Sequence, residues 1–99
     1  MKRVRFRPAA RADLARIAEE GRERWGREAA RDYILSMRGQ LARLAEQPGI
    51  GSDRSLLAPG LRKATVGSHH AFYRAIKDGI IVVRVLHPGM IAPQWIDEG

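Results

Sequence analysis

Cysteine is absent from this 99-residue sequence, which excludes disulfide bonds and thiolate metal sites. Of the three histidines, His69 and His70 are adjacent and would point to opposite faces of a strand, so a zinc site is not expected. The sequence also lacks an apolar run long enough to cross a membrane, and its basic N-terminus lacks the apolar segment of a signal peptide. We therefore expect a cytoplasmic protein that needs no metal or other cofactor.

Motifs that bind nucleotides or activate a serine are also missing, namely G-x-G-x-x-G, G-x-x-x-x-G-K-[ST] and G-x-S-x-G. The carboxylates fall mostly in the helical part of the chain, where a solvated surface is their ordinary role. One metal-free chemistry stays open, because arginine and histidine can cleave RNA by stabilising charge on the phosphate and moving protons. Its candidate residues are Arg74, Arg84, His70 and His87. Otherwise we expect a protein that acts by binding and catalyses no reaction.

Negative charge is scarce, since eleven Asp and Glu residues stand against eighteen Lys and Arg, for a net charge of +7. All of the cations except Lys2, Lys63 and Lys77 are arginines, which form bidentate pairs with carboxylates and phosphates. This excess favours an acidic partner, whether a nucleic acid, an anionic surface or an acidic protein. Charge alone does not choose among the three.

The first half of the chain has the periodicity of one strand and two helices. Valine and phenylalanine alternate with arginine over residues 2–7, which predicts a strand with one buried face. Pro8 suits the first turn of a helix, and apolar residues at helical spacing extend that helix over 8–24. After a break at Gly26, a second apolar stripe runs until Pro48. Two amphipathic helices joined by so short a break form an αα-hairpin.

The second half of the chain is typical of strands, with β-rich segments at 61–66, 69–76 and 80–87. Asp78-Gly79 is a strong hairpin signal between the last two. The order β-α-α-β-β-β predicts an α+β fold, in which an antiparallel sheet that includes the first strand has the helical hairpin packed on one face. We expect a single domain over residues 1–99, with an irregular tail at 88–99.

Neighbouring side chains in the last predicted strand point to opposite sides of the sheet. One side would hold Ile81, Val83, Val85 and His87, and the other side Ile80, Val82, Arg84 and Leu86. Both sets are mostly apolar and the helical hairpin covers only one, so we expect the second set to be open to a partner. Arg84, with Arg74 on the same side, would bind a carboxylate or phosphate there. In the alternative, Arg84 has partners within its own chain.

Short motifs recur along the chain in an order that is typical of one family. They are Phe6-Arg7-Pro8-Ala9-Ala10, Asp13-Leu14, Arg24-Trp25-Gly26, Pro48-Gly49-Ile50-Gly51, Pro59-Gly60-Leu61-Arg62, Val66-Gly67-Ser68-His69, Phe72-Tyr73-Arg74 and Arg84-Val85-Leu86-His87. With this ordered set, which covers about residues 4–90, the chain resembles the ParE toxins of the RelE/ParE superfamily, from bacterial type II toxin-antitoxin systems. The uncharged segment 88–95 favours the ParE branch over RelE-like mRNA cleavers, which have extra basic and acid/base residues there.

The resemblance implies a toxin that inhibits DNA gyrase and is neutralised by a ParD-like antitoxin. Such an antitoxin binds DNA through a ribbon-helix-helix domain and has an acidic, disordered C-terminal segment, so the toxin meets DNA only through it. We expect this segment to cover the open face, at Ile80, Val82, Arg84, Leu86 and Arg74. His87 and Trp95, at the strand exit and in the tail, are the predicted target contacts. The alternatives are a RelE-like ribosome-dependent mRNA endoribonuclease and an inactive toxin-fold binding protein.

Overall fold

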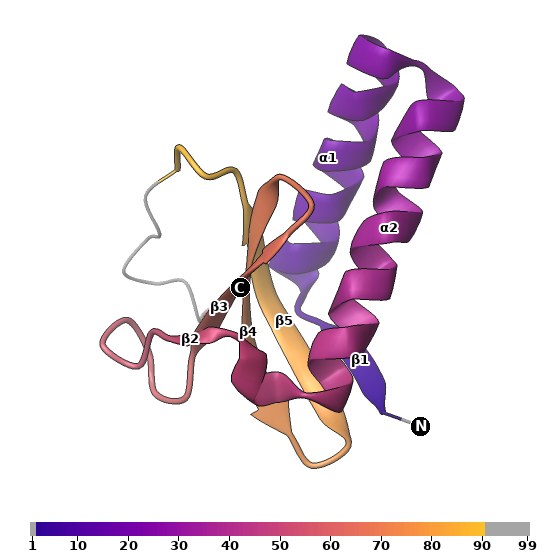
Figure 1. Cartoon of the computed structure of the whole chain (residues 1–99). Coiled ribbons are helices and arrows are strands. Elements are labelled where there is room, and N and C mark those ends of the chain that lie inside the picture. Colours follow the sequence, from indigo (N-terminus) through magenta and orange to yellow (C-terminus); the bar gives the residue numbers. More distant parts are fainter. Residues whose placement is uncertain (1, 91–99) are drawn as a thin grey trace.

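The computed structural model describes residues 2–90, which form two helices and a five-stranded sheet (Figure 1). The helices and strands are, in chain order, β1 (Arg3–Phe6), α1 (Pro8–Trp25), α2 (Arg27–Glu46), β2 (Ser52–Asp53), β3 (Arg62–Val66), β4 (His69–Ile76) and β5 (Gly79–Leu86). A 3₁₀ turn, Pro48–Ile50, follows α2. The predicted α+β order is confirmed, and the short β2 is an addition within the segment expected to be a loop.

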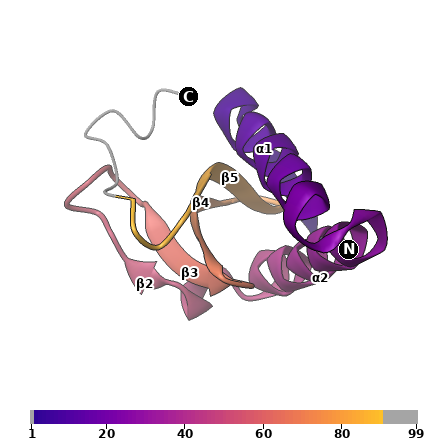
Figure 2. The same ribbon diagram turned by 90° about the horizontal axis from the view of Figure 1, so that it is seen from above.

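The strand order in the sheet is β1-β5-β4-β3-β2. Every neighbouring pair is antiparallel except β1 and β5, which are parallel, so the predicted antiparallel sheet is correct for four of its five strands. Both helices lie on the same side of the sheet, and the connection between β2 and β3 lies on the other side (Figure 2). We call the side away from the helices the far face.

Gly26 separates the two helices. Its φ of 90° lies in the left-handed region that glycine adopts without steric cost. Its N–H donates to the Arg22 carbonyl and its own carbonyl accepts from the Ala30 N–H, so the same residue closes α1 and opens α2. Gly21 lies where the helices meet, because a Cβ added there would be 3.2 Å from the Cβ of Ala30. The absent side chain therefore allows the helices to pack closely.

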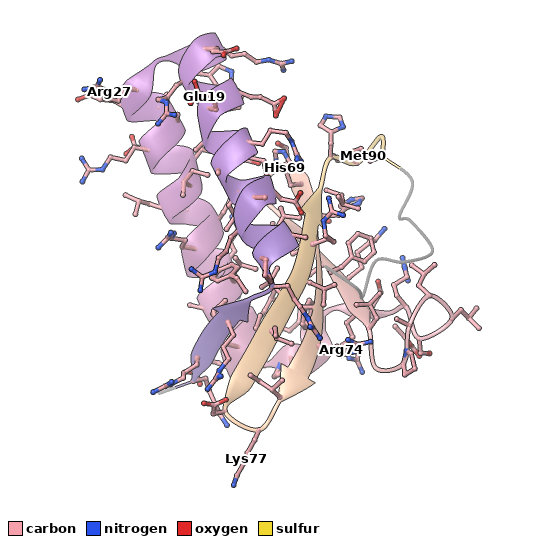
Figure 3. The ribbon with its side chains drawn as sticks, turned by 180° about the vertical axis from the view of Figure 1, so that it is seen from behind. Glu19, Arg27, His69, Arg74, Lys77 and Met90 are labelled. Atoms are coloured by element: carbon pink, nitrogen blue, oxygen red, sulfur yellow. The ribbon has the colours of Figure 1, made fainter. Side chains whose placement is uncertain are left out.

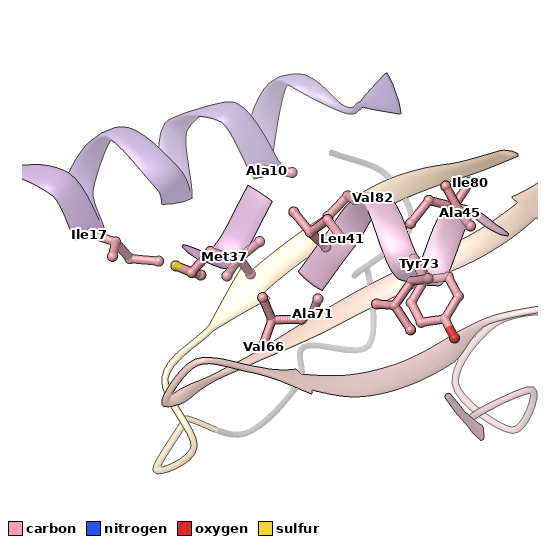
Figure 4. Packing of buried hydrophobic residues seen from close by; sticks show 12 residues of the cluster. Ala10, Ile17, Met37, Leu41, Ala45, Val66, Ala71, Tyr73, Ile80 and Val82 are labelled. Carbon is pink, nitrogen blue, oxygen red and sulfur yellow. The ribbon is translucent and has the colours of Figure 1, made fainter. Parts of the chain in front are cut away.

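An apolar cluster fills the space between the helical hairpin and the sheet (Figure 4). Its buried members are Ala10, Ile17, Met37, Leu41, Leu44, Ala45, Val66, Ala71, Tyr73, Ile80, Val82 and Val85. Burying one side chain of the size of leucine contributes about 1.5–3 kcal/mol. The hydroxyl of the buried Tyr73 donates to the Pro48 carbonyl at 2.6 Å and accepts from the Gly51 N–H at 2.9 Å. Burial raises the pKa of Tyr73, so the hydroxyl keeps its proton and holds the 3₁₀ turn against the sheet.

The predicted open face does not exist in the form expected. Ile80 and Val82 are both 0% exposed and belong to the cluster beneath the helices. A β-bulge also divides the predicted set, because Val82 pairs with Tyr73 whereas Arg84 pairs with Phe72, the residue next to Tyr73, so that Arg84 starts from the opposite side of the sheet. The extra residue breaks the alternation on which the prediction depended. The prediction that Ile80, Val82, Arg84 and Leu86 share one uncovered face is therefore wrong.

Leu86 lies in a second, smaller cluster on the far face of the sheet. Phe72 and Val83 join it there, and Ala58 and Leu61 from the connection between β2 and β3 pack against them. Leu86 is only 2% exposed. The chain therefore covers this part of the far face with its own residues, and Leu86 is not available to a partner as predicted.

Arg84 is held by a buried carboxylate, Asp13 on α1. β1 pairs with β5 only as far as Val82, and beyond that point no strand of the described residues borders the outer edge of β5. Asp13, which is 1% exposed, takes the place of a strand there. Its Oδ2 accepts from the Val85 N–H at 2.9 Å and from Arg84 Nε at 2.7 Å, and its Oδ1 accepts from Arg84 Nη2 at 2.9 Å. The hydrogen bond to Asp13 raises the pKa of Arg84. Of the two alternatives for Arg84, the structure confirms partners within the chain.

Asp13→Ala is expected to destabilise the fold by about 3 kcal/mol, since it removes the carboxylate that accepts from a mostly buried guanidinium and from a strand N–H. Urea unfolding followed by circular dichroism measures the change. Asp32→Ala is the matched control, because Asp32 is an exposed acid on α2. Equal stability losses in the two variants would show that the Asp13 contacts add nothing to the fold.

Candidate partner-binding surfaces

A groove runs along the outer side of the helical hairpin, from β1 towards the turn between the helices. We call it the arginine groove, after the residues on its rim, which are Arg11, Arg22, Arg27, Arg31 and Arg38. Its floor is apolar and consists of Val4, Phe6, Leu14, Ala15, Ala18, Ala30, Ile34 and Leu35. The two halves of the groove share Ala18, Ile34 and Arg38, and each half encloses about 560 Å³. None of the described residues that line it is acidic.

The groove follows from residue spacing on the two helices. Arg31, Ile34 and Arg38 recur on α2 at intervals of three and four, which places them on one side of that helix. Ala15 and Ala18 on α1 are separated by three positions in the same way, and their short side chains leave the space between the helices hollow. Sequence reasoning found both helices but missed the groove, although arginines spaced with alanines at helical intervals were a usable signal.

The rim is exposed and positively charged. Arg27 lies at the end of α2 that is nearest the helical turn, as Figure 3 shows, and it extends into solvent. Arg22 is paired with Glu19, one turn earlier on α1. The described ion pairs include none for Arg11, Arg27, Arg31 or Arg38. The groove therefore combines an apolar floor with arginines of which only Arg22 has an ion pair among those described.

A small pocket of about 140 Å³ lies between α1, the first residue of β4 and the residue that follows β5. His69 and His87 line it, with ring centroids 6.0 Å apart in an edge-to-face arrangement. The Tyr33 hydroxyl lies 2.8 Å from Nδ1 of His69 and accepts the Ser68 N–H at 2.7 Å. Trp25, which is 53% exposed, packs edge-on against Tyr33. We call this the histidine pocket.

The remaining predicted site residues are dispersed. Arg74 lies on the far face, two residues from Phe72 and opposite Ile81, and its Nε donates to the Pro59 carbonyl at 2.6 Å. The register therefore confirms that Arg74 and Arg84 start from the same side of the sheet. His87 is exposed beside the histidine pocket. Trp95 lies outside the described residues.

The four candidates for RNA cleavage do not form one site in the described part of the chain. His70 is on the far face with Arg74, whereas His87 faces His69 on the helical side. The guanidinium of Arg84 is bound to Asp13. Within residues 2–90, no group of three or more histidine or acidic residues could hold a metal ion, and neither helix has the length and apolar character of a membrane span.

His69 gives the fold a predictable response to acid. Partial burial lowers its pKa below 6.5, and so does the neighbouring His87. Below pH 6.5 the unfolded chain therefore binds a proton that the folded chain does not, and the free energy of unfolding is expected to fall as the pH decreases from 6.5 towards the lowered pKa. The slope should stay well under roughly 1.4 kcal/mol per pH unit, the limit for one proton, because His69 is partly exposed.

Urea unfolding over a pH series that spans 6.5 measures this slope. His69→Gln should flatten it, and His70→Gln, on the far face, should change it less. A slope that His69→Gln leaves intact would assign the acid sensitivity to another group.

Comparison with known proteins agrees with this architecture. The family model described as the ParE toxin of the type II toxin-antitoxin system parDE matches residues 4–92. Toxin ParE1 of Caulobacter vibrioides is 38% identical over 93% of this chain and 95% of its own length, and Toxin ParE1 of Mycobacterium tuberculosis is 42% identical over 84% and 86%. A solved structure of the chromosomal ParDE system from P. aeruginosa has the same fold, with a TM-score of 0.72, 24% identity, and coverage of 88% of this chain and 96% of that one. The chain belongs to the ParE toxin family of type II toxin-antitoxin systems.

Proposed function

We propose that this ParE toxin is neutralised by a ParD-like antitoxin that lays an acidic, amphipathic helix in the arginine groove. The observation that supports this most directly is the groove itself, because its floor is apolar and its rim is formed by five arginines. A helix that binds in a groove buries one apolar stripe and keeps its polar flanks near the rim. Carboxylates on those flanks would meet arginines suited to bidentate pairing.

The length of the groove suits a helix of several turns. It follows α1 and α2, which have 18 and 20 residues, and a helix of that length measures roughly 27–30 Å. Apolar side chains at every third or fourth position of the bound helix would lie over Leu14, Ala18 and Ile34. If such a segment folds as it binds, the apolar floor supplies the burial that offsets the entropy cost of its ordering.

The same groove argues against nucleic acid as the direct partner. A phosphate backbone would pair with the arginines but would leave the apolar floor without apolar contact. An acidic protein helix uses both parts of the surface. Of the three acidic partners that the net charge favoured, we therefore infer a protein.

The antitoxin site in this proposal replaces the one inferred from strand alternation. Ile80, Val82 and Leu86 are buried, so a partner reaches them only if the fold opens. Arg84 binds Asp13, and its side chain is 13% exposed. Arg74 supports the connection between β2 and β3 through Pro59. These contacts favour structural roles for all five residues, and the groove is the surface that is accessible.

For the target we propose DNA gyrase, the target that the resemblance implied, and a mechanism by binding without catalysis. The dispersal of the arginine and histidine candidates supports binding over RNA cleavage. His87 remains our proposed target contact, since it is exposed beside Trp25 at the mouth of the histidine pocket. Trp95 stays a prediction in the same role. A cytoplasmic location follows from this target.

Expression of the chain without its antitoxin is expected to arrest growth and induce the DNA-damage response, and the purified protein should inhibit DNA supercoiling by gyrase. Co-expression with the protein encoded by the adjacent upstream reading frame should restore growth. Active gyrase together with cleaved mRNA would instead support the RelE-like ribonuclease. Normal growth under full expression would support an inactive toxin-fold binding protein.

Arg38→Glu is expected to weaken antitoxin binding by about tenfold or more, because it puts a negative charge where both halves of the groove meet. Arg38 is exposed, so the fold should be unaffected. Isothermal titration with the antitoxin from the adjacent reading frame measures the affinity, and rising salt should reduce the difference. Lys77→Glu makes the same charge change at the exposed β4–β5 turn (Figure 3) and should bind normally. Equal affinity of the two variants would remove the groove from the proposal.

A further inference from the structure

The outer edge of β3 is only partly covered. β2 is two residues long, and its pairs with β3 are Ser52 with Lys63 and Asp53 with Arg62. Among the strands of residues 2–90, none lies on that side of β3 from Ala64 to Val66. Figure 1 shows β2 and β3 at the border of the sheet opposite β1. This border ends the sheet with an open strand edge over residues 64–66.

The hairpin of β3 with β4 determines which N–H and carbonyl groups of β3 point towards β4 and which point away from the sheet. Gly67 and Ser68 form a two-residue turn, so the pair Val66 and His69 closes the hairpin with hydrogen bonds between the strands. Two residues earlier, the N–H and the carbonyl of Ala64 also point towards β4. Thr65 lies between them and directs its N–H and its carbonyl away from the sheet.

The neighbouring backbone donor is already satisfied. The Gly67 N–H donates to Oε1 of Gln40 on α2 at 3.0 Å. On the other side, the Lys63 carbonyl accepts from the Ser52 hydroxyl at 3.2 Å. Within residues 2–90, the Thr65 N–H and carbonyl are thus the backbone groups of this edge that have no protein partner. The unpaired part of the edge is therefore short and lies between Lys63 and Gly67, whose outward backbone groups are already hydrogen-bonded.

A cleft of about 380 Å³ lies beside this edge, between β3 and the C-terminal half of α2. Leu44, Ala64, Val66 and Ile50 give it apolar surface, and Ile50 is 56% exposed. Arg43 places positive charge at its rim, and Lys63 adds a second cation to the same strand edge on the far face, where it pairs with Phe72. A strand added beside Thr65 would direct alternate side chains into this cleft.

A second copy of the chain is a poor occupant of this edge. Each copy has a net charge of +7, and pairing two such edges would bring Arg43 and Lys63 of one copy close to those of the other. Charged side chains, lysine above all, commonly protect strand edges from self-association in this way. An acidic chain gains from the same two cations. The charge of this edge therefore selects an acidic partner.

We propose that an extended, acidic segment of the antitoxin adds to the sheet as a short strand beside β3, with main-chain hydrogen bonds to Thr65. One apolar side chain of that segment lies in the cleft against Leu44 and Ile50, and its carboxylates lie near Arg43 and Lys63. This inference depends on the proposed antitoxin binding and specifies a second contact beyond the arginine groove. Strand addition of this kind obtains affinity from the backbone and specificity from the pockets beside it.

One antitoxin chain is able to reach both surfaces. Arg38 lines the arginine groove, and Gln40 and Arg43 line the cleft, so α2 contributes to both. A helix with its side chains is about 10 Å across, and an extended chain advances about 3.3 Å per residue. A linker of roughly five residues therefore passes from the groove around α2 to the edge of β3.

Amide hydrogen exchange of Thr65, followed by NMR in the free toxin and in the complex with the antitoxin from the adjacent reading frame, tests this proposal. The Thr65 amide should exchange rapidly in the free protein and at least about tenfold more slowly in the complex, because it becomes hydrogen-bonded. The amides of Ala64 and Val66 face β4 and should be protected in both states. They serve as internal controls.

Thr65→Pro removes the outward N–H and keeps the pairing with β4, a position at which edge strands accept proline. It should weaken antitoxin binding by about tenfold, whereas Thr65→Val, which keeps the amide, should bind within about twofold of the unmodified toxin. The exchange measurement uses the unmodified protein, so it stays decisive if the proline variant does not fold.

The outcomes separate this inference from the proposed function. A stable complex in which the Thr65 amide still exchanges freely would overturn the strand addition and leave antitoxin binding intact. The absence of any complex would overturn both. Protection of Thr65 together with weaker binding of Thr65→Pro is the result that we expect.

Discussion

The described fold depends on one buried carboxylate, that of Asp13, which joins the helices to the sheet where strand pairing ends. β1 covers only the first half of the outer edge of β5. Asp13 satisfies the next part of that edge through Val85 and holds the guanidinium of Arg84 with both of its oxygens. Two oxygens with three donors fix α1 against β5 in both position and rotation. The arginine groove and the histidine pocket both have α1 as a wall, so their shapes depend on this contact.

Helices, strands and their order could be predicted from the sequence, because they follow from local spacing. Pro8, Gly26 and Asp78-Gly79 mark boundaries that the structure reproduces within about two residues. The faces of β5 could not be predicted, since a bulge at Val83 depends on how Phe72 and Tyr73 meet the strand across the sheet. A single added residue was enough to place Arg84 and Leu86 on the side of the sheet opposite Ile80 and Val82.

The role of Asp13 was hidden for a related reason. An acid on a helix has the same local sequence whether it faces water or a strand edge that lies 71 positions further along the chain. The excess of arginine was plain in the composition, but its location on one groove appeared only when two helices placed their stripes side by side. Properties that belong to one element were therefore accessible from sequence, and properties shared by two distant elements were not.

The pairing of β1 with β5 also sets the order in which the chain can mature on the ribosome. The first strand borders the last one, so it has no neighbour until nearly all of the described chain has been synthesised. Until then the nascent helical hairpin exposes Met37 and Leu41, which the finished sheet buries. Contacts so distant in sequence form slowly in comparison with local helices. A truncated translation product that ends before β5 therefore lacks a complete sheet, and the folded surface forms only after β5 has been synthesised.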